Sequence, residues 1–243
     1  MSLKTTINYS PNFYIKKRSK KSIKFLIFHY TGMKSEKRSI KRLTSIQSKV
    51  AGHYLIRNNG RIVTFVPDLY VAWHAGVSAW KKYNFLNKNS IGIEISNPGH
   101  QFGYKKFSLK QINSLIKLSR FLIKKYKINK KNILGHSDIS TERKKDPGEK
   151  FPWQFLSKKG IGIWHNIKKT KLKEFRKEKL KISEQLKCIK LLKNIEYFNN
   201  KLNDKKHSKL IKSFQRRFRQ ELVDGIMDLE CLIIAEKLSK LYK

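Results

Sequence analysis

The chain has 243 residues, of which 39% are hydrophobic and 12% aromatic, so it can build a folded core and is not a disordered protein. Its net charge of +39 comes from 45 Lys and 11 Arg spread along the sequence, whereas phosphate-reading surfaces favour the planar guanidinium of Arg, and we therefore expect no nucleic-acid partner. The sequence contains no long uncharged apolar run, which excludes a transmembrane helix.

The N-terminal sequence and the cysteines indicate where in the cell the protein is found. Residues 1–22 are basic but lack the apolar stretch of an export signal, and no Cys follows them as a lipid anchor. We expect a cytoplasmic protein, or a periplasmic or exported one if a signal has been removed from the chain. Cys188 and Cys231 are far apart in the sequence and form no CxxC pair of the kind that binds metals, so we expect two buried free thiols. We also expect a monomer.

The first part of the chain alternates predicted strands and helices. Residues 24–29 form a short apolar run that ends at a histidine, which predicts a buried strand. Residues 35–46 have helical spacing. Two apolar segments, 53–56 and 62–66, flank Asn58-Asn59-Gly60, and this pattern predicts a hairpin because Asn and Gly tolerate the positive φ of a tight turn.

The next part leads from a long loop into further alternating elements. Residues 68–89 are rich in Trp, Gly, Ser and Asn and predict a functional loop, and residues 90–96 predict a central strand. Ser108 caps an amphipathic helix whose apolar face runs to residue 126. Residues 133–134 predict a short strand, and residues 153–157 predict a short helix.

Strands mixed with helices predict an α/β fold with a central mixed β-sheet flanked by helices over residues 1–165. Residues 166–182 are highly charged and predict a linker. Residues 183–243 show helical spacing without a strand pattern. We therefore expect a second, small all-α domain of three helices after the α/β domain.

A carboxylate stands inside one of the apolar strands. The first 165 residues contain only seven acidic residues, which are Glu36, Asp68, Glu94, Asp138, Glu142, Asp146 and Glu149. Glu94 lies between Ile93 and Ile95, and an ionised carboxylate is costly to bury unless it is paired or lies beside a metal. Glu94 therefore either points outward from an edge strand or belongs to a site.

Two histidines and a second carboxylate stand at the ends of predicted elements. His29 closes the first strand, His136 follows the last one, and Asp146 lies in the loop beyond. Strand ends bring distant residues together at one edge of an α/β sheet. Two His and one carboxylate form a catalytic zinc set that leaves the fourth position for water. Spacing alone does not distinguish this set from ordinary polar residues.

The local sequences around these residues are more specific. They are Phe28-His29-Tyr30-Thr31, Ala72-Trp73-His74-Ala75-Gly76-Val77-Ser78, Ser90-Ile91-Gly92-Ile93-Glu94, and Gly135-His136-Ser137-Asp138-Ile139 followed by Arg143-Lys144-Lys145-Asp146-Pro147-Gly148. In this order they resemble the type-2 N-acetylmuramoyl-L-alanine amidase family, which includes muropeptide-recycling and outer-membrane amidases and is related to peptidoglycan recognition proteins. The resemblance covers residues 25–164.

The resemblance implies a site, residue by residue. The zinc ligands of the family correspond to His29, His136 and Asp146, and its acid/base glutamate corresponds to Glu94. Zinc lowers the pKa of a bound water and polarises the amide carbonyl. A glutamate near that water accepts its proton and delivers it to the leaving nitrogen.

The same motifs imply an electrophile and substrate contacts. The family's lysine, two residues before the aspartate ligand, corresponds to Lys144, with Lys145 as the alternative, and its ammonium stabilises an oxyanion. Asp138 orders the loop or supports a zinc histidine, and His53 fits a structural role better than one in the site. The long loop supplies the expected substrate-binding residues Trp73, His74, Ala75 and Gly76, although Trp73 fits loop packing equally well.

The C-terminal helices carry a looser resemblance. The segment Phe214-Gln215-Arg216-Arg217-Phe218 and its surroundings resemble the three-helix peptidoglycan-binding domain often fused to these amidases. Its apolar positions would suit any helical bundle. Two roles stay open, which are binding of the cell wall and packing against the catalytic domain.

The resemblance implies a bacterial zinc-dependent hydrolase that cleaves the amide bond between N-acetylmuramic acid and L-alanine in peptidoglycan or muropeptides, during cell-wall turnover or recycling. A non-catalytic peptidoglycan recognition protein is the first alternative, and the intact zinc set argues against it. A nucleic-acid-binding protein is the second. The sequence leaves open whether the substrate is intact wall or soluble anhydro-muropeptide.

Overall fold

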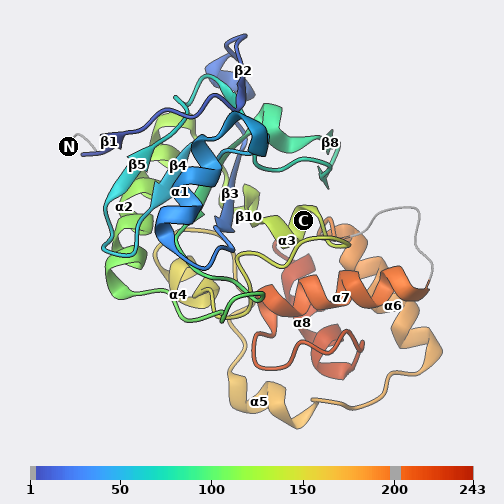
Figure 1. Ribbon diagram of the computed structural model, residues 1–243. Helices are drawn as coiled ribbons and strands as arrows, with labels where there is room; N and C mark the ends of the chain where they lie inside the picture. The colour runs from blue at the N-terminus through green and yellow to red at the C-terminus, as the bar shows by residue number, and fades with distance from the viewer. Residues whose placement is uncertain (1–3, 198–203, 243) are drawn as a thin grey trace.

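The computed structural model describes residues 4–197 and 204–242. Its main element is a six-stranded sheet, which Figure 1 shows with helices packed around it. The strand order is β1–β5–β4–β9–β3–β10. The strands are β1 (Thr6–Ile7), β3 (Phe25–Tyr30), β4 (Tyr54–Ile56), β5 (Ile62–Thr64), β9 (Ser90–Ile95) and β10 (Ile133–Gly135). The β4–β5 pair is antiparallel and the other neighbouring pairs are parallel, so the sheet is mixed, as predicted.

Helices pack around this sheet, and the last four helices of the chain form a group beside it. They are α1 (Glu36–Thr44), α2 (Leu109–Tyr126), α3 (His136–Ile139), α4 (Trp153–Lys158), α5 (Lys169–Glu174), α6 (Ile182–Asn194), α7 (Asp204–Phe218) and α8 (Leu229–Ser239). The predicted long loop carries short strands, β6 (Val71–Ala72), β7 (Ala79–Trp80) and β8 (Tyr83–Asn84), and β6 pairs with β2 (Phe13–Tyr14). No described helix combines the length and apolar character needed to cross a membrane.

Local sequence signals explain where the β4–β5 turn forms and where helix α2 begins. Gly60 has a φ of +83° in the β4–β5 turn, and a Cβ there would lie 2.8 Å from the carbonyl oxygen of Lys110, so the turn needs glycine for two reasons. At the start of α2 the backbone N–H of Gln111 donates to Ser108 Oγ at 3.2 Å, and the Ser108 N–H donates to Gln111 Oε1 at 3.0 Å. This capping box confirms the predicted helix start.

The two faces of the sheet differ. Alternate residues of a strand point to opposite faces. Ile91, Ile93 and Ile95 of β9 share a hydrophobic core with the apolar side of α2. Leu55 of β4 points to the other face, into a second core that includes Leu43 of α1. Glu94 pairs with Leu55 across β9 and β4, so it belongs to this second face, opposite α2.

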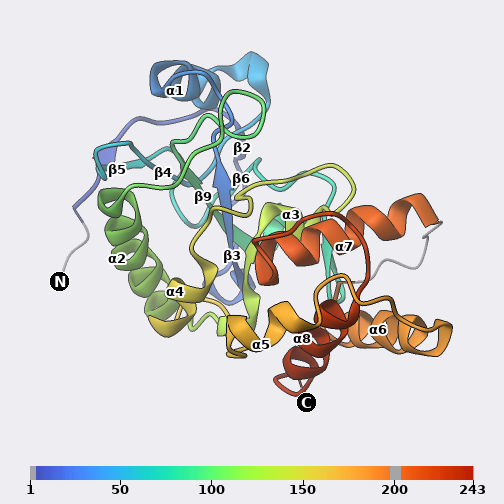
Figure 2. The ribbon, with the colours of Figure 1, turned by 90° about the horizontal axis from the view of Figure 1, so that it is seen from below.

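The C-terminal helices pack beside the sheet. Figures 1 and 2 show α5, α6, α7 and α8 gathered on one side of the molecule, with α7 next to α3. Side chains of these helices, including Phe214, belong to the same hydrophobic core as the sheet. Cys188 and Cys231 are buried free thiols, as predicted. The division at residues 165 and 182 stays a prediction.

Candidate active site

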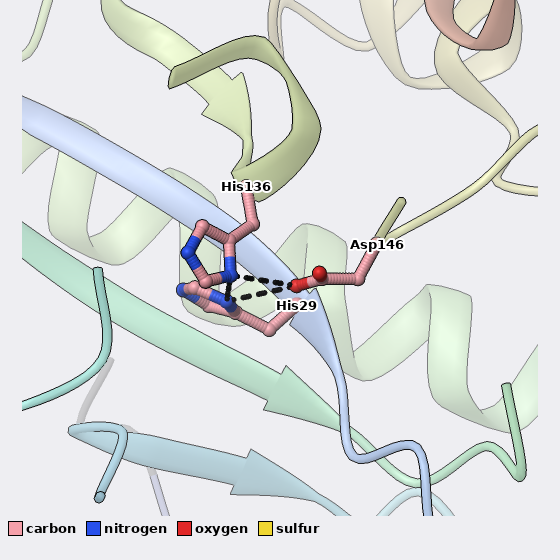
Figure 3. Close-up of side chains that lie close together, drawn as sticks. All are labelled: His29, His136 and Asp146. Carbon is pink, nitrogen blue, oxygen red and sulfur yellow. Dashed lines mark hydrogen bonds and ion pairs between the residues drawn. The ribbon is translucent and has the colours of Figure 1, made fainter. Parts of the chain in front are cut away.

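Three side chains converge at the carboxyl ends of β3 and β10. His29 comes from β3, His136 begins α3 directly after β10, and Asp146 lies in the following loop (Figure 3). The Nδ1 atoms of His29 and His136 are 3.0 Å apart, and each lies 3.0 Å from Oδ2 of Asp146. All three residues are buried. The structure thus brings the predicted ligand set together.

The cluster suits a shared metal ion. Ligand atoms bound at about 2.0–2.1 Å in a tetrahedral site lie about 3.3 Å from one another, close to the distances found here. Nε2 of His136 lies 3.1 Å from the carbonyl oxygen of Ala75, which can only accept, so a neutral His136 directs the lone pair of Nδ1 at the cluster. A lone pair and a carboxylate that face the same point favour a cation between them.

Burial and mutual contact set the charges of these groups. Burial alone would raise the pKa of Asp146, but the contacts with His136 and His29 outweigh it and hold that pKa well below its usual range. Burial, followed by the neighbouring His136, lowers the pKa of His29 to about 4. An ionised carboxylate and a neutral imidazole are the forms that bind metals.

Glu94 lies beside this cluster on the same face of the sheet. In the parallel pairing of β3 and β9 it is the direct partner of His29, and β9 lies between β3 and β4 in the sheet. Its side chain is buried, with 6% of the residue exposed. The alternative in which Glu94 points outward from an edge strand is therefore wrong.

The surroundings of Glu94 suit proton transfer. Within the described ranges its Oε2 has no hydrogen-bond partner. Burial raises the pKa of Glu94 well above its ordinary value, and the nearby Asp146 carboxylate acts in the same direction, whereas Lys144 and Arg42 lower it. A carboxyl group whose pKa is raised by burial holds a proton more readily than an exposed one, and it can both accept a proton and return it.

The two candidate lysines differ in position. Lys144 is half-buried, and its charge lowers the pKa values of both His29 and Glu94. Lys145 is exposed to solvent. The backbone N–H of Lys144 donates to the carbonyl oxygen of Ser140 at 3.0 Å, which anchors this loop. The geometry thus favours Lys144 over Lys145 as the cation of the site.

The predicted substrate loop divides into buried and open parts. His74 was expected to contact substrate, but it is buried next to the cluster of His29, His136 and Asp146, with Nδ1 3.0 Å from Nε2 of His29. Ala75 is buried as well, and its carbonyl faces His136. Trp73 is half-buried and forms a T-shaped contact with the ring of Tyr14 at a centroid distance of 5.5 Å, while Gly76 is exposed. Sequence spacing could not show this, because space for the His74 ring is provided by a glycine on β9.

Two residues that hold this loop were not singled out from the sequence. The guanidinium of Arg143 donates to the carbonyl oxygens of Ala75 at 2.6 Å and Val77 at 2.7 Å. Asn87 Oδ1 accepts from the backbone N–H groups of His74 at 3.1 Å and Ala75 at 2.6 Å. Arg143 stands directly before Lys144 in a motif, which was the available signal, but its partners are more than 60 residues away in sequence.

Asp138 and His53 have structural surroundings. Asp138 Oδ2 accepts from the backbone N–H of Gly135 at 2.7 Å and pairs with the guanidinium of Arg217 from α7. Asp138 therefore stabilises the turn that leads into His136. His53 is fully buried, and its Nδ1 accepts from the backbone N–H of Gly92 at 3.0 Å, in line with the expected structural role.

Relatives of this chain share one activity. A profile of the N-acetylmuramoyl-L-alanine amidase family matches residues 19–149. The N-acetylmuramoyl-L-alanine amidase AmiD of Escherichia coli is 36% identical over 233 residues, which cover 90% of this chain and 83% of AmiD. The 1,6-anhydro-N-acetylmuramyl-L-alanine amidase AmpD of Haemophilus influenzae is 42% identical over 109 residues, or 44% of this chain and 57% of AmpD.

Solved structures extend the similarity over most of the chain. Escherichia coli AmiD in complex with anhydro-N-acetylmuramic acid-L-Ala-D-gamma-Glu-L-Lys has a TM-score of 0.79 at 34% identity, covering 91% of this chain and 90% of that one. AmpDh3 of Pseudomonas aeruginosa in complex with an anhydromuramic pentapeptide has a TM-score of 0.79 at 30% identity, covering 98% of each chain. With its mixed sheet, its ligand set and these matches, the chain belongs to the N-acetylmuramoyl-L-alanine amidase family.

Proposed function

We propose that this amidase hydrolyses the amide bond between N-acetylmuramic acid and L-alanine with a zinc ion held by His29, His136 and Asp146. The observation that carries the proposal is the mutual distance of 3.0 Å between the three ligand atoms, beside a buried carboxyl group. Two nitrogens and one oxygen at tetrahedral spacing are a donor set that zinc enzymes use, and it leaves one position open.

Each neighbouring residue has a task that its position allows. Bound zinc supplies Lewis acidity, which lowers the pKa of a water and polarises the amide carbonyl. Glu94 accepts a proton from the attacking water through its free carboxyl oxygen and delivers it to the leaving nitrogen of alanine. The positive charge of Lys144, which acts on both His29 and Glu94, stabilises the negative charge that develops on the carbonyl oxygen.

Soluble anhydro-muropeptides are the substrates that we propose. The support is that AmiD and AmpDh3 were each solved with an anhydromuramic peptide, and that AmpD is named for the 1,6-anhydro sugar. Incubation with anhydro-muropeptides and, in parallel, with intact sacculi compares the two substrates. Faster release of peptide from sacculi would contradict this part of the proposal. The cytoplasmic location and the monomeric state stay predictions.

Metal dependence and peptide release test the proposal. Purified protein is expected to contain close to one zinc per chain, measured by elemental analysis. Mass spectrometry should detect free peptide and anhydro-N-acetylmuramic acid after incubation with the muropeptide, and a chelator should stop the release until zinc is restored. A protein that binds the muropeptide but releases no peptide with zinc present would instead be a recognition protein, and the proposal would fail.

A further inference from the structure

We propose that His74 is a positioning residue that determines which ring nitrogen His29 offers to the metal. The inference rests on the proposed zinc site. Nε2 of His29 lies 3.0 Å from Nδ1 of His74, and Nε2 of His74 lies 3.1 Å from Oγ of Ser90. Oγ of Ser90 in turn lies 2.6 Å from the carbonyl oxygen of Leu86. A buried chain of hydrogen bonds thus joins the metal ligand to the backbone.

The last hydrogen bond, from Ser90 to the carbonyl oxygen of Leu86, determines which atom donates in each of the other hydrogen bonds. A carbonyl oxygen only accepts, so the hydroxyl proton of Ser90 points to Leu86, and Oγ is left to accept from Nε2 of His74. A neutral His74 with its proton on Nε2 has a lone pair on Nδ1, and that lone pair accepts from Nε2 of His29. His29 therefore carries its proton on Nε2 and directs the lone pair of Nδ1 at the cluster.

The His74 ring has little freedom to leave this position. His74 is 4% exposed, and its backbone N–H donates to Asn87 Oδ1 at 3.1 Å. Gly92 provides the space for the ring, because a Cβ at residue 92 would lie 2.4 Å from Cγ of His74. The ring also meets the ring of His29 edge-on, with centroids 5.1 Å apart. The backbone and the sheet together hold the acceptor in place.

The neighbouring residue does the same for the other metal histidine. The carbonyl oxygen of Ala75 lies 3.1 Å from Nε2 of His136. Consecutive residues of one loop therefore orient both imidazoles, one through a side chain and one through the backbone. Only the contact made by His74 can be removed by substitution, so it offers the test.

Two substitutions separate positioning from simple packing. His74→Leu keeps much of the buried volume but removes the acceptor for Nε2 of His29. We expect it to weaken zinc binding by about 10- to 100-fold, the usual loss when a residue that supports a metal ligand is removed. His74→Asn can present its side-chain oxygen near the position of Nδ1, so it should restore part of the affinity. If His74 only fills space, the apolar variant should bind zinc as well as the asparagine variant.

Zinc affinity is measured by competition with a chromophoric chelator, with thermal unfolding of each metal-free protein as a check on folding. His165→Leu is the matched control, because His165 is also buried with two hydrogen bonds, to the carbonyl oxygen of Phe218 and the N–H of Ile167, and is not part of the cluster. It should lose stability but keep zinc affinity. Unchanged affinity in a folded His74→Leu variant would overturn the inference, whereas a wild-type protein that binds no zinc would overturn the proposed function instead.

The tautomer itself can be read without any variant. Long-range ¹H–¹⁵N spectra of the zinc-loaded, ¹⁵N-histidine-labelled protein distinguish protonated from unprotonated ring nitrogens. We expect the proton on Nε2 in both His29 and His74. A proton on Nδ1 of His74 would contradict the inference even if the substituted proteins failed to fold.

Discussion

At the scale of single residues, the sheet sets the distance between His29, the proposed metal ligand, and Glu94, the proposed proton-transfer group. His29 and Glu94 are direct partners on β3 and β9, and neighbouring strands lie about 4.8 Å apart. The backbones of both residues lie within strands and not in loops. The roles proposed for Glu94 and Lys144 can therefore be tested by substitutions that leave the sheet unchanged.

Glu94→Gln keeps the shape of the side chain but removes the proton acceptor. We expect kcat to fall by about 10²- to 10⁴-fold, the usual contribution of a general acid–base group, with no loss of bound zinc. Peptide release and metal content are measured on the same preparation. Glu36→Gln is the control, because Glu36 lies in α1 and binds Arg57. A Glu94→Gln enzyme as fast as the wild type would refute the assignment.

Lys144→Met and Lys145→Met form a matched pair of adjacent substitutions. Loss of one cation that stabilises an oxyanion costs about 10²- to 10³-fold in kcat, so the first variant should show a loss of this size. The second should stay within about threefold of the wild type, since surface substitutions have small effects. Equal losses in the two variants, or a larger loss for Lys145→Met, would reject the preference for Lys144. Steady-state kinetics on the anhydro-muropeptide provide the measurement.

At the scale of elements, the sequence predicted the structure within single segments, such as a helix or a hairpin, better than it predicted contacts between segments. The apolar periodicity and the cap at Ser108 predicted α2, and the Asn-Asn-Gly turn predicted the β4–β5 hairpin. The position of His74 could not be predicted, because its ring depends on the absence of a side chain at Gly92, a residue of another element. The hydrogen bond from Arg143 to Ala75 in the same loop could not be predicted either, because the two residues are 68 positions apart in the sequence.

The cap of α2 gives an element-scale prediction. Ser108→Ala removes the side-chain oxygen that accepts from the Gln111 N–H, so we expect the free energy of unfolding to fall by about 1 kcal/mol, with unchanged peptide release. Urea denaturation measures the change. Ser19→Ala is the control, because Ser19 precedes a short 3₁₀ turn without a side-chain cap and is exposed. Equal effects of the two substitutions would argue against the capping role.

At the scale of the whole molecule, a buried ion pair connects the C-terminal helices to the site. Arg217 of α7 pairs with Asp138, donates to the carbonyl oxygen of Ile133 at 2.9 Å and stacks over Trp153 at 4.3 Å. Asp138 also accepts from the hydroxyl of Tyr197. The segment that resembles a wall-binding domain thus packs in part against the turn before His136, in line with one of the two roles that the sequence left open. Wall binding by this module stays a prediction.

Removing one side of this pair should be costly. Arg217→Met leaves the buried Asp138 carboxylate without its cation, and we expect the free energy of unfolding to fall by about 3–5 kcal/mol. The double variant Arg217→Met with Asp138→Asn leaves no buried charge unpaired, so it should recover part of that loss. Urea denaturation of the single and double variants measures both effects. A double variant no more stable than the single one would show that the charge pairing is not the cause.

Buried histidines predict how stability depends on pH. Burial is the largest cause that lowers the pKa of His53 to about 3 and that of His165 to about 4. Below the ordinary pKa of 6.5, these histidines bind a proton in the unfolded chain but stay neutral in the folded one. Their contribution to the free energy of unfolding is therefore fully present above pH 6.5 and is lost as the pH falls towards 4.

Denaturation curves at pH 7.5, 6 and 5 are expected to show this decline. Each such histidine contributes a slope of at most about 1.4 kcal/mol per pH unit. His165→Leu removes one of them, so its stability should depend less steeply on pH between about 6.5 and 4 than that of the wild type. Parallel pH profiles for the two proteins would contradict this assignment.

The cluster of His29, His136 and Asp146 also links remote parts of the chain. His29 and Asp146 are 117 residues apart in the sequence, and no unfolded chain holds them together. Zinc that binds the folded form alone would add about 1.4 kcal/mol of stability for each tenfold rise in free ion above its dissociation constant. Metal supply would then govern how long the enzyme persists as well as how fast it works. A cell short of zinc would leave it open to proteases, and wall recycling would decline with the lifetime of the protein.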